Sequence, residues 1–132
     1  MKTNLEDDNY CFICGEKNPF GLKLRFSLHE GRATVEFTPE KPHQGYKDIV
    51  HGGIISALID EAMVKALLLQ GIPAITAEIN VRFKNPLLIG ESVLVEGTVI
   101  KINRRIAETY GTVRKSDGTL IAEGNAKLLR QD

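Results

Sequence analysis

Alternation of apolar and polar residues predicts that most of this chain forms β-strands. Every second residue from Leu22 to Leu28 is apolar, which is the period of a strand with one buried face. Glu30-Gly31 then predicts a turn, and the alternation resumes from Ala33 to Phe37, so these two segments are expected to form a hairpin. Four later strands are predicted at residues 75–83, 92–102, 107–115 and 120–129.

A helical pattern separates the first two strands from the other four. Residues 38–50 contain two prolines and a glycine and are predicted to form a loop. Apolar residues then cover most of the circumference of a helix from about Gly53 to Gln70, roughly 27 Å long at 1.5 Å per residue. Gly71 and Pro73 predict its end. A helix this apolar is expected to be buried on nearly every side.

The order of elements predicts an α+β domain in which an antiparallel sheet wraps one helix. The chain has 132 residues without an internal repeat or linker, so one domain is expected at residues 11–132, after a flexible polar segment at residues 1–10. One helix covers only one face of a sheet. The other face needs water or a partner, and a dimer is the simplest solution.

Charge and composition argue against several kinds of partner. Lys plus Arg equals Asp plus Glu, at 17 each, so the chain has no overall field to attract nucleic acid or an anionic membrane. The longest apolar stretch, Ile54 to Leu69, is too short and too charged to span a bilayer. The polar, acidic start is unlike a signal peptide. We therefore expect a cytoplasmic protein without nucleic-acid or membrane partners.

The start of the helix carries the residues with the clearest chemical potential. His51-Gly52-Gly53 opens it, and Asp60 follows about two and a half turns later. The first amides of a helix have no acceptor within it, so they can stabilise negative charge developing on a carbonyl oxygen. A nearby carboxylate can attack that carbonyl or activate a water. The combination favours acyl chemistry, although His51 can also be a simple cap and the glycines a simple entry turn.

Asp60 and Glu61 are adjacent, yet the sequence predicts different surroundings for them. Glu61 lies one turn before Lys65, which favours an ion pair in solvent or at the rim of the domain. No helical neighbour of Asp60 is cationic. A carboxylate on such an apolar face needs a distant partner, a backbone group or water, and carboxylates of this kind are common at functional sites.

Several motifs follow one another along the chain. They are the leader Cys11-Phe12-Ile13-Cys14-Gly15 with Asn18-Pro19 and Gly21-Leu22, then Gln44-Gly45, His51-Gly52-Gly53, Leu58-Ile59-Asp60-Glu61-Ala62, and the strand from Thr76 to Phe83 with Asn85-Pro86. Together they resemble the hot-dog-fold acyl-CoA thioesterases of the phenylacetyl-CoA thioesterase (PaaI-like) branch. The resemblance implies a long helix wrapped by an antiparallel sheet, and a homodimer or homotetramer with sites at the subunit interface.

The resemblance also implies how the helix start is used. The amide of Gly52 would bind the thioester carbonyl, and Gln44 and His51 would help to orient it. Gly53 belongs to the substrate-binding residues in the same interpretation. Gln44 is the nearest equivalent of a family Asn or Gln that some members carry one residue later, where this chain has Gly45.

For the carboxylate, the resemblance implies that Asp60 comes from the neighbouring subunit and acts as general base or nucleophile. Thr76 matches a position at which family members use a hydroxyl to hold the water. Alternation by itself places Thr76 on the polar face of its strand together with Glu78, and does not place it beside Asp60. Glu61 remains a lesser candidate, because other hot-dog enzymes use Glu at the Asp60 position.

Coenzyme A is anionic, so its phosphates need local cations. The candidates near strand ends are Arg82, Lys84, Arg104 and Arg105. Each of them can equally be a solvated surface charge.

The pair Cys11-x-x-Cys14 allows three interpretations. A zinc site needs four ligands, or three and a water, and the sequence has no second cysteine pair. A thioredoxin-like redox role needs a βαβ setting, whereas a hairpin follows here. We interpret the pair as a structural turn, assign no metal ligand and no cofactor, and leave the zinc and redox roles as alternatives.

The chain is thus predicted to hydrolyse an acyl-CoA thioester to a free acid and CoA. A thiolate leaves readily, so the reaction does not require a full Ser-His-Asp triad, and Ser56 has no evident histidine partner. Two alternatives stay open. One is a hot-dog dehydratase or hydratase acting on acyl-CoA or acyl-carrier protein, and the other is a non-catalytic acyl-binding protein in which Asp60 is structural.

Overall fold

The computed structural model describes residues 2–132, which form one α-helix, a short 3₁₀ helix and six β-strands. The helices are η1 (Lys41–His43) and α1 (Gly52–Leu68). The strands are β1 (Ser27–His29), β2 (Arg32–Phe37), β3 (Ala74–Phe83), β4 (Val93–Ile102), β5 (Ile106–Lys115) and β6 (Leu120–Arg130).

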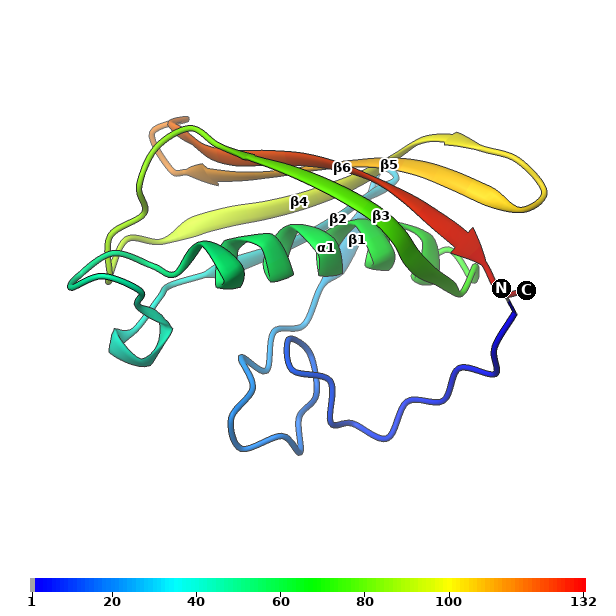
Figure 1. The fold of residues 1–132 in the computed structure, drawn as a ribbon, viewed down its shortest axis with the longest axis horizontal. Helices are drawn as coiled ribbons and strands as arrows, with labels where there is room; N and C mark the ends of the chain where they lie inside the picture. The colour runs from blue at the N-terminus through cyan, green and yellow to red at the C-terminus, as the bar shows by residue number, and fades with distance from the viewer. Residues whose placement is uncertain (1) are drawn as a thin grey trace.

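The six strands form one antiparallel sheet in the order β1-β2-β4-β5-β6-β3. Helix α1 runs along one face of this sheet, and the chain segment before β1 runs on the side of the helix away from the sheet (Figure 1). The predicted α+β architecture is therefore confirmed. Helix α1 ends at Leu68, close to the predicted end, and Gly71 adopts a φ of 87° just beyond it. Among the described residues, no helix combines the length and apolarity needed to cross a membrane.

A row of three glycines lets α1 lie close against the centre of the sheet. Gly97 pairs with Gly111, and Gly111 pairs with Gly124 on the next strand. A Cβ on Gly97 would overlap the carbonyl of Ala62, and a Cβ on Gly111 would come within 3.0 Å of the Ile59 side chain. Close packing of this kind excludes water from the apolar face of the helix. The largest fully buried side chains of α1 are Leu58, Ile59, Met63 and Leu67.

The first predicted strand is wrong over most of its length. Residues 22–26 lie outside β1, because the amides of Leu22 and Leu24 donate to the carbonyls of Phe12 and Ile13 at 2.9 Å each. Lys23 also has a positive φ of 55°, which interrupts an extended backbone. The alternation still has a purpose, because Leu22 and Leu24 pack against the hydrophobic core. The alternation therefore reflects packing against the core rather than pairing within the sheet.

Strand β3 forms one edge of the sheet and contains a β-bulge. Thr76 pairs with Leu128 and Glu78 pairs with Lys127, so two steps along β3 oppose one step along β6. Such a bulge switches the face to which later side chains point. The expected common face of Thr76 and Glu78 is therefore wrong: Thr76 lies on the helix side, opposite the buried Leu128. Bulges are common next to active sites, where they redirect a side chain.

Candidate active site

Of the two glycine amides at the start of α1, that of Gly53 is hydrogen-bonded and that of Gly52 is free. His51 is the N-cap, and its Nδ1 accepts a hydrogen bond from the amide of Gly53 at 2.8 Å. Within residues 2–132, the amide of Gly52 has no acceptor. The ring of Phe83 lies beside this amide, since a Cβ on Gly52 would be 3.5 Å from two of its ring atoms. Of the two glycines, Gly52 is thus the one whose amide is available to an external oxygen.

The loop before α1 holds His51 and Gln44 in place. The amide of His51 donates to the carbonyl of His43 at 2.9 Å, and Gln44 forms an isolated β-bridge with Val50. The side-chain oxygen of Gln44 accepts from the amide of Asp48 at 3.1 Å. Gln44 is consequently tied within its own loop near the helix start.

Asp60 has a partner that lies sixteen residues away in the sequence. The hydroxyl of Thr76 donates a hydrogen bond to Oδ1 of Asp60 at 2.5 Å, from strand β3 to helix α1. The bulge in β3 makes this contact possible, because it turns Thr76 toward the helix. Both residues are half-buried. This bond uses one lone pair of the carboxylate and orients the group, while Oδ2 has no protein partner among the described residues.

Within one chain, Asp60 and the amide of Gly52 are too far apart to act on the same atom. They are eight residues apart on one helix, which corresponds to about 12 Å along its axis. Reacting groups must lie within about 3–3.5 Å of each other. A single chain therefore carries two halves of a site: an amide donor at the helix start, and an oriented carboxylate in the middle of the helix.

Glu61 lies in different surroundings from those expected. The predicted ion pair with Lys65 is present, with Nζ 3.9 Å from Oε2, but the two side chains are only 15% and 18% exposed. The leader segment covers them, and the Cys11 thiol donates to Oε2 of Glu61 at 3.6 Å. The predicted ion pair is therefore present, but it is more enclosed than a solvated pair because a segment fifty residues earlier in the chain packs over it.

Cys14 belongs to the same enclosed cluster. Burial raises the pKa of its thiol to about 12, and hydrogen bonds with Glu61 and Cys11 add to the shift. Both cysteines are free in this structure. A thiol with so high a pKa is protonated at neutral pH and is a poor nucleophile. Cys14 therefore lacks the lowered pKa that is typical of an activated redox thiol.

The four candidate cations for coenzyme A lie at two ends of the sheet. Arg82 and Lys84 are at the end of β3, next to Phe83 and the start of α1. Arg104 and Arg105 are in the turn between β4 and β5, where the carbonyl of Arg105 accepts from the amide of Arg130. The two groups are separated by the length of β3, about 30 Å at 3.3 Å per residue. One chain does not bring all four together.

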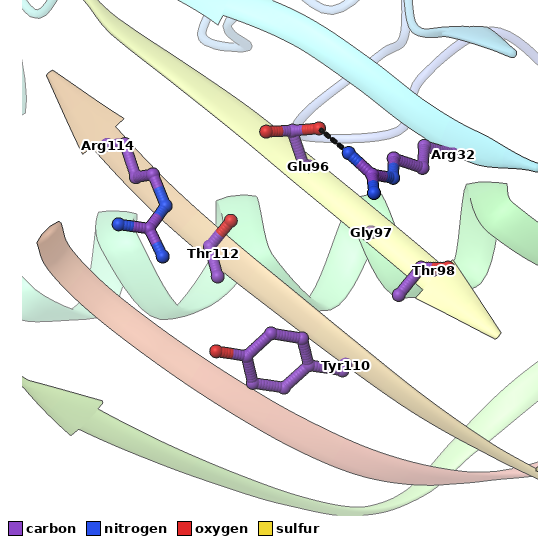
Figure 2. A pocket seen from close by; sticks show the side chains of 7 residues that line it. All are labelled: Arg32, Glu96, Gly97, Thr98, Tyr110, Thr112 and Arg114. Atoms are coloured by element: carbon purple, nitrogen blue, oxygen red, sulfur yellow. Dashed lines mark ion pairs between the residues drawn. The ribbon is translucent and has the colours of Figure 1, made fainter. Parts of the chain in front are cut away.

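A hollow of about 270 Å³ lies on the face of the sheet away from α1 (Figure 2). Its lining residues are Arg32, Glu96, Gly97, Thr98, Tyr110, Thr112 and Arg114. It contains none of the predicted site residues, and it lies across the sheet from Asp60 and Gly52. Burial raises the pKa of Tyr110, as does the neighbouring Glu123, so the phenol stays protonated. We do not assign the acyl site to this hollow.

The sequence profile of the Thioesterase superfamily matches residues 47–122. Human acyl-coenzyme A thioesterase 13 is 29% identical over 101 residues, which are 74% of this chain and 72% of the human protein.

Solved structures of other proteins share the fold. The crystal structure of a thioesterase superfamily protein superposes with a TM-score of 0.84 at 23% identity, over 90% of this chain and 62% of that chain. The PaaI protein of the E. coli phenylacetic acid degradation operon gives a TM-score of 0.77 at 22% identity, over 83% and 84% of the two chains. These likenesses confirm the predicted hot-dog fold and the resemblance to PaaI. The profile match covers more than half of the sequence, including all of α1, and the chain therefore belongs to the Thioesterase superfamily.

Proposed function

We propose that this protein hydrolyses acyl-CoA thioesters to a free acid and CoA. The observation that carries the proposal is the hydrogen bond from Thr76 to Asp60, which orients a carboxylate on the same helix whose first amide, that of Gly52, is free. Both features occur in a chain of the Thioesterase superfamily with a human relative named acyl-coenzyme A thioesterase 13. The proposal rests on this chemistry together with the family.

The proposed reaction uses the two halves of the site for different tasks. The amide of Gly52 donates to the thioester oxygen and stabilises the oxyanion, for which one preorganised donor is worth about 3–4 kcal/mol. Asp60 removes a proton from water, or attacks the carbonyl itself, while Thr76 holds the carboxylate and the water in position. The thiolate of CoA then leaves and takes up the proton that Asp60 removed from water, which regenerates the carboxylate. On the nucleophilic route the thiolate takes its proton from solvent, and water then hydrolyses the anhydride between Asp60 and the acyl group to the free acid. His51 and Gln44 keep the helix start in its conformation.

A second copy of the chain is proposed to bring the two halves together. Strand β3 is a ten-residue edge with one unpaired side, and Ile79 and Phe83 on it are 39% and 54% exposed. Long edges with exposed apolar side chains favour pairing with another chain. If β3 pairs with its copy about a two-fold axis between Ile79 and Asn80, Thr76 lies opposite Phe83 of the partner subunit.

This pairing explains why the halves are apart within one chain. Phe83 lies beside Gly52 at the start of α1, and Thr76 is hydrogen-bonded to Asp60. If Thr76 of one subunit lies opposite Phe83 of the partner subunit, each Asp60 therefore approaches the Gly52 end of the partner's helix. The same two-fold axis would carry Arg105 of the partner subunit toward Arg82 and Lys84, joining the candidate cations for the CoA phosphates. Association of two such dimers into a tetramer, and the cytoplasmic location, stay predictions.

The direct test is release of free thiol from a panel of acyl-CoAs of different chain length and aromaticity, with the purified full chain. Turnover of at least one acyl-CoA to the acid and CoA is the expected result. Tight binding of acyl-CoA without any release would contradict the proposal and favour an acyl-binding protein. Loss of water from a 3-hydroxyacyl-CoA, without thiol release, would favour a dehydratase.

Replacement of Gly52 by proline tests the oxyanion donor with little disturbance of the helix. Proline lacks the amide hydrogen but is well tolerated at the first helical position, and His51 has the extended backbone (φ −61°, ψ 132°) that a following proline needs. We expect kcat to fall about 10²- to 10³-fold. A Gly52→Ala control keeps the amide and should retain most of the activity. Equal activity of the two variants would remove Gly52 from the mechanism.

Mixing two inactive variants tests whether the site is shared. In a mixed dimer of Gly52→Pro and Asp60→Asn chains, one of the two sites has both an intact amide and an intact carboxylate. Random reassociation should restore about a quarter of the wild-type activity if the halves come from different subunits. A mixture that stays as inactive as its parents would contradict the shared site.

A further inference from the structure

The leader segment and α1 together form a cluster of three metal-ligating side chains outside the proposed catalytic site. Cys11, Cys14 and Glu61 each offer one ligand atom, and these atoms all lie within 4.8 Å of one another. The Sγ of Cys11 is 3.6 Å from Oε2 of Glu61. All three residues are half-buried, and both thiols are free. The distance between Cys11 Sγ and Glu61 Oε2 is close to that between two ligands that share a tetrahedral ion with bonds of about 2.0–2.3 Å.

The backbone around Cys11 is arranged as it is around a metal-bound thiolate. The amides of Ile13 and Cys14 both donate to the Sγ of Cys11, at 3.4 Å each. The amide of Gly15 donates to the carbonyl of Cys11 at 2.9 Å, and a Cβ on Gly15 would overlap the Cys11 backbone. Two amide dipoles aimed at one sulfur stabilise its negative charge, in the way that outer-shell hydrogen bonds tune a metal ligand.

We propose that Cys11, Cys14 and Glu61 bind a zinc-class divalent metal ion that fastens the leader segment to α1. Two thiolates and a carboxylate match the borderline-soft character of zinc rather than that of magnesium or calcium. A solvent-facing hollow of about 350 Å³, lined in part by Cys14 and Lys65, provides an entry path and room for a water as fourth ligand. Binding would release the two thiol protons to solvent.

The charges around the cluster suit such an ion. Two thiolates and one carboxylate carry three negative charges, so a bound divalent ion leaves one negative charge over. Lys65, with Nζ 3.9 Å from Oε2 of Glu61, supplies the balancing positive charge. Adjacent residues of a helix point roughly 100° apart, so Glu61 can serve this site while Asp60 faces Thr76. The ion would therefore be structural, separate from the proposed thioester chemistry.

The alternative is that the cluster is a closed hydrogen-bond network without a metal, in which the thiols donate to Glu61. Cobalt substitution separates the two. The full chain is stripped of metal with a chelator under reducing conditions, titrated with Co²⁺, and then back-titrated with Zn²⁺. We expect one Co²⁺ per chain, a thiolate-to-cobalt charge-transfer band, tetrahedral d–d bands, and their loss on addition of Zn²⁺.

Two variants and one control assign the ligands. Cys14→Ser should weaken Zn²⁺ binding by on the order of 100-fold and Glu61→Gln by on the order of 10-fold, whereas Glu108→Gln, an exposed carboxylate on β5, should leave it unchanged. Zn²⁺ should also raise the Tm of the wild-type chain. Absence of the charge-transfer band and of Zn²⁺ binding in the wild-type chain would overturn the proposal whether or not the variants fold. Equal affinity in all three variants would overturn it as well.

Discussion

Asp60 and Glu61 are neighbours on α1, yet they lie on two sides of the helix with opposite properties. Asp60 faces β3, the open edge of the sheet, where it receives a single hydrogen bond from Thr76. Glu61 faces the leader segment, where Cys11, Cys14 and Lys65 surround it. Asp60 can accept further hydrogen bonds at a surface that a second copy of the chain can cover. Glu61 is already enclosed by its own chain.

If Asp60 has the proposed role, one helix carries the reactive carboxylate on one side and the carboxylate that anchors the leader segment on the other. A carboxylate acts as a base only if it keeps a lone pair for substrate or water, and the β3 side leaves one to Asp60. A carboxylate that is fully surrounded contributes instead to the position of the segment that surrounds it. We therefore expect changes on the Asp60 side to affect turnover, and changes on the Glu61 side to affect stability.

The largest expected effect is the loss of turnover in Asp60→Asn, for which Glu61→Gln is the matched comparison. Asp60→Asn should lower kcat for thiol release by about 10²–10⁴, the usual contribution of a general base, with the fold and oligomeric state unchanged. Glu61→Gln should change kcat by less than about fivefold, because it does not reach the substrate. Steady-state kinetics and size-exclusion chromatography measure both. A larger loss in Glu61→Gln than in Asp60→Asn would reverse the assignment of the two sides.

Removal of the Thr76 hydroxyl should have the next largest effect. Thr76→Val keeps the shape of the side chain but deletes the donor to Asp60. A hydrogen bond to a charged group is worth about 1.5–3 kcal/mol, so kcat should fall roughly 10- to 150-fold. Thr76→Ser restores the donor and should recover most of the rate. If valine and serine variants have the same kcat, Thr76 has only a packing role.

On the other side of the helix, Glu61→Ala should lower the free energy of unfolding by about 1–3 kcal/mol, because it leaves Lys65 and two thiols without their acceptor. The matched control is Glu96→Ala, which breaks a more exposed ion pair with Arg32 at a similar N–O distance of 3.8 Å. It should cost less than about 1 kcal/mol. Urea unfolding curves compare the two. Similar losses would show that the leader does not enclose Glu61 in solution.

The smallest expected effect is the loss of stability in His51→Ala, at the start of the helix and away from both carboxylates. His51→Ala removes the cap on the Gly53 amide and should cost about 0.5–2 kcal/mol of stability. His51→Asn keeps a capping oxygen and should restore the stability. Denaturation measures the contribution of His51 to stability, and steady-state kinetics measures its contribution to turnover. Recovery of stability without recovery of turnover would give His51 a role in orienting the substrate as well.

Local pattern predicted the elements of the fold and the wrapping of one helix by an antiparallel sheet, but it did not predict the order of the strands in that sheet. The helix, the glycine that ends it and the four later strands were predicted from hydrophobic periodicity and turn residues. These signals relate residues that are only a few positions apart in the sequence. The position of β3 at the edge, next to β6, depends on pairings between residues that are about 40 to 56 positions apart in the sequence, from Phe83 with Ala122 to Ala74 with Arg130. No local signal encodes such a pairing. The bulge at residue 77 left the alternation in the sequence unbroken, so it was equally hidden.

The candidate site shows the same division. Asp60 and Glu61 could be distinguished by their helical neighbours, and the helix start by its glycines. The resemblance implied that Thr76 holds the water, whereas its contact with Asp60 was not predicted and comes from the structure. The enclosure of Glu61 by the leader was missed, because the spacing of Glu61 and Lys65 reports their mutual distance and not what packs over them.

The sequence by itself determined which residues can form helix or strand, where the helix begins, and which side chains carry chemistry, because these depend on backbone sterics and on periods of a few residues. Only the tertiary structure decided which partners each of these side chains contacts. It gave Asp60 a hydroxyl partner across a bulged edge strand and gave Glu61 a cover of two thiols. The reason is physical: burial and hydrogen bonding join segments that are distant along the chain, and those contacts form only when the whole sheet and its leader close around the helix.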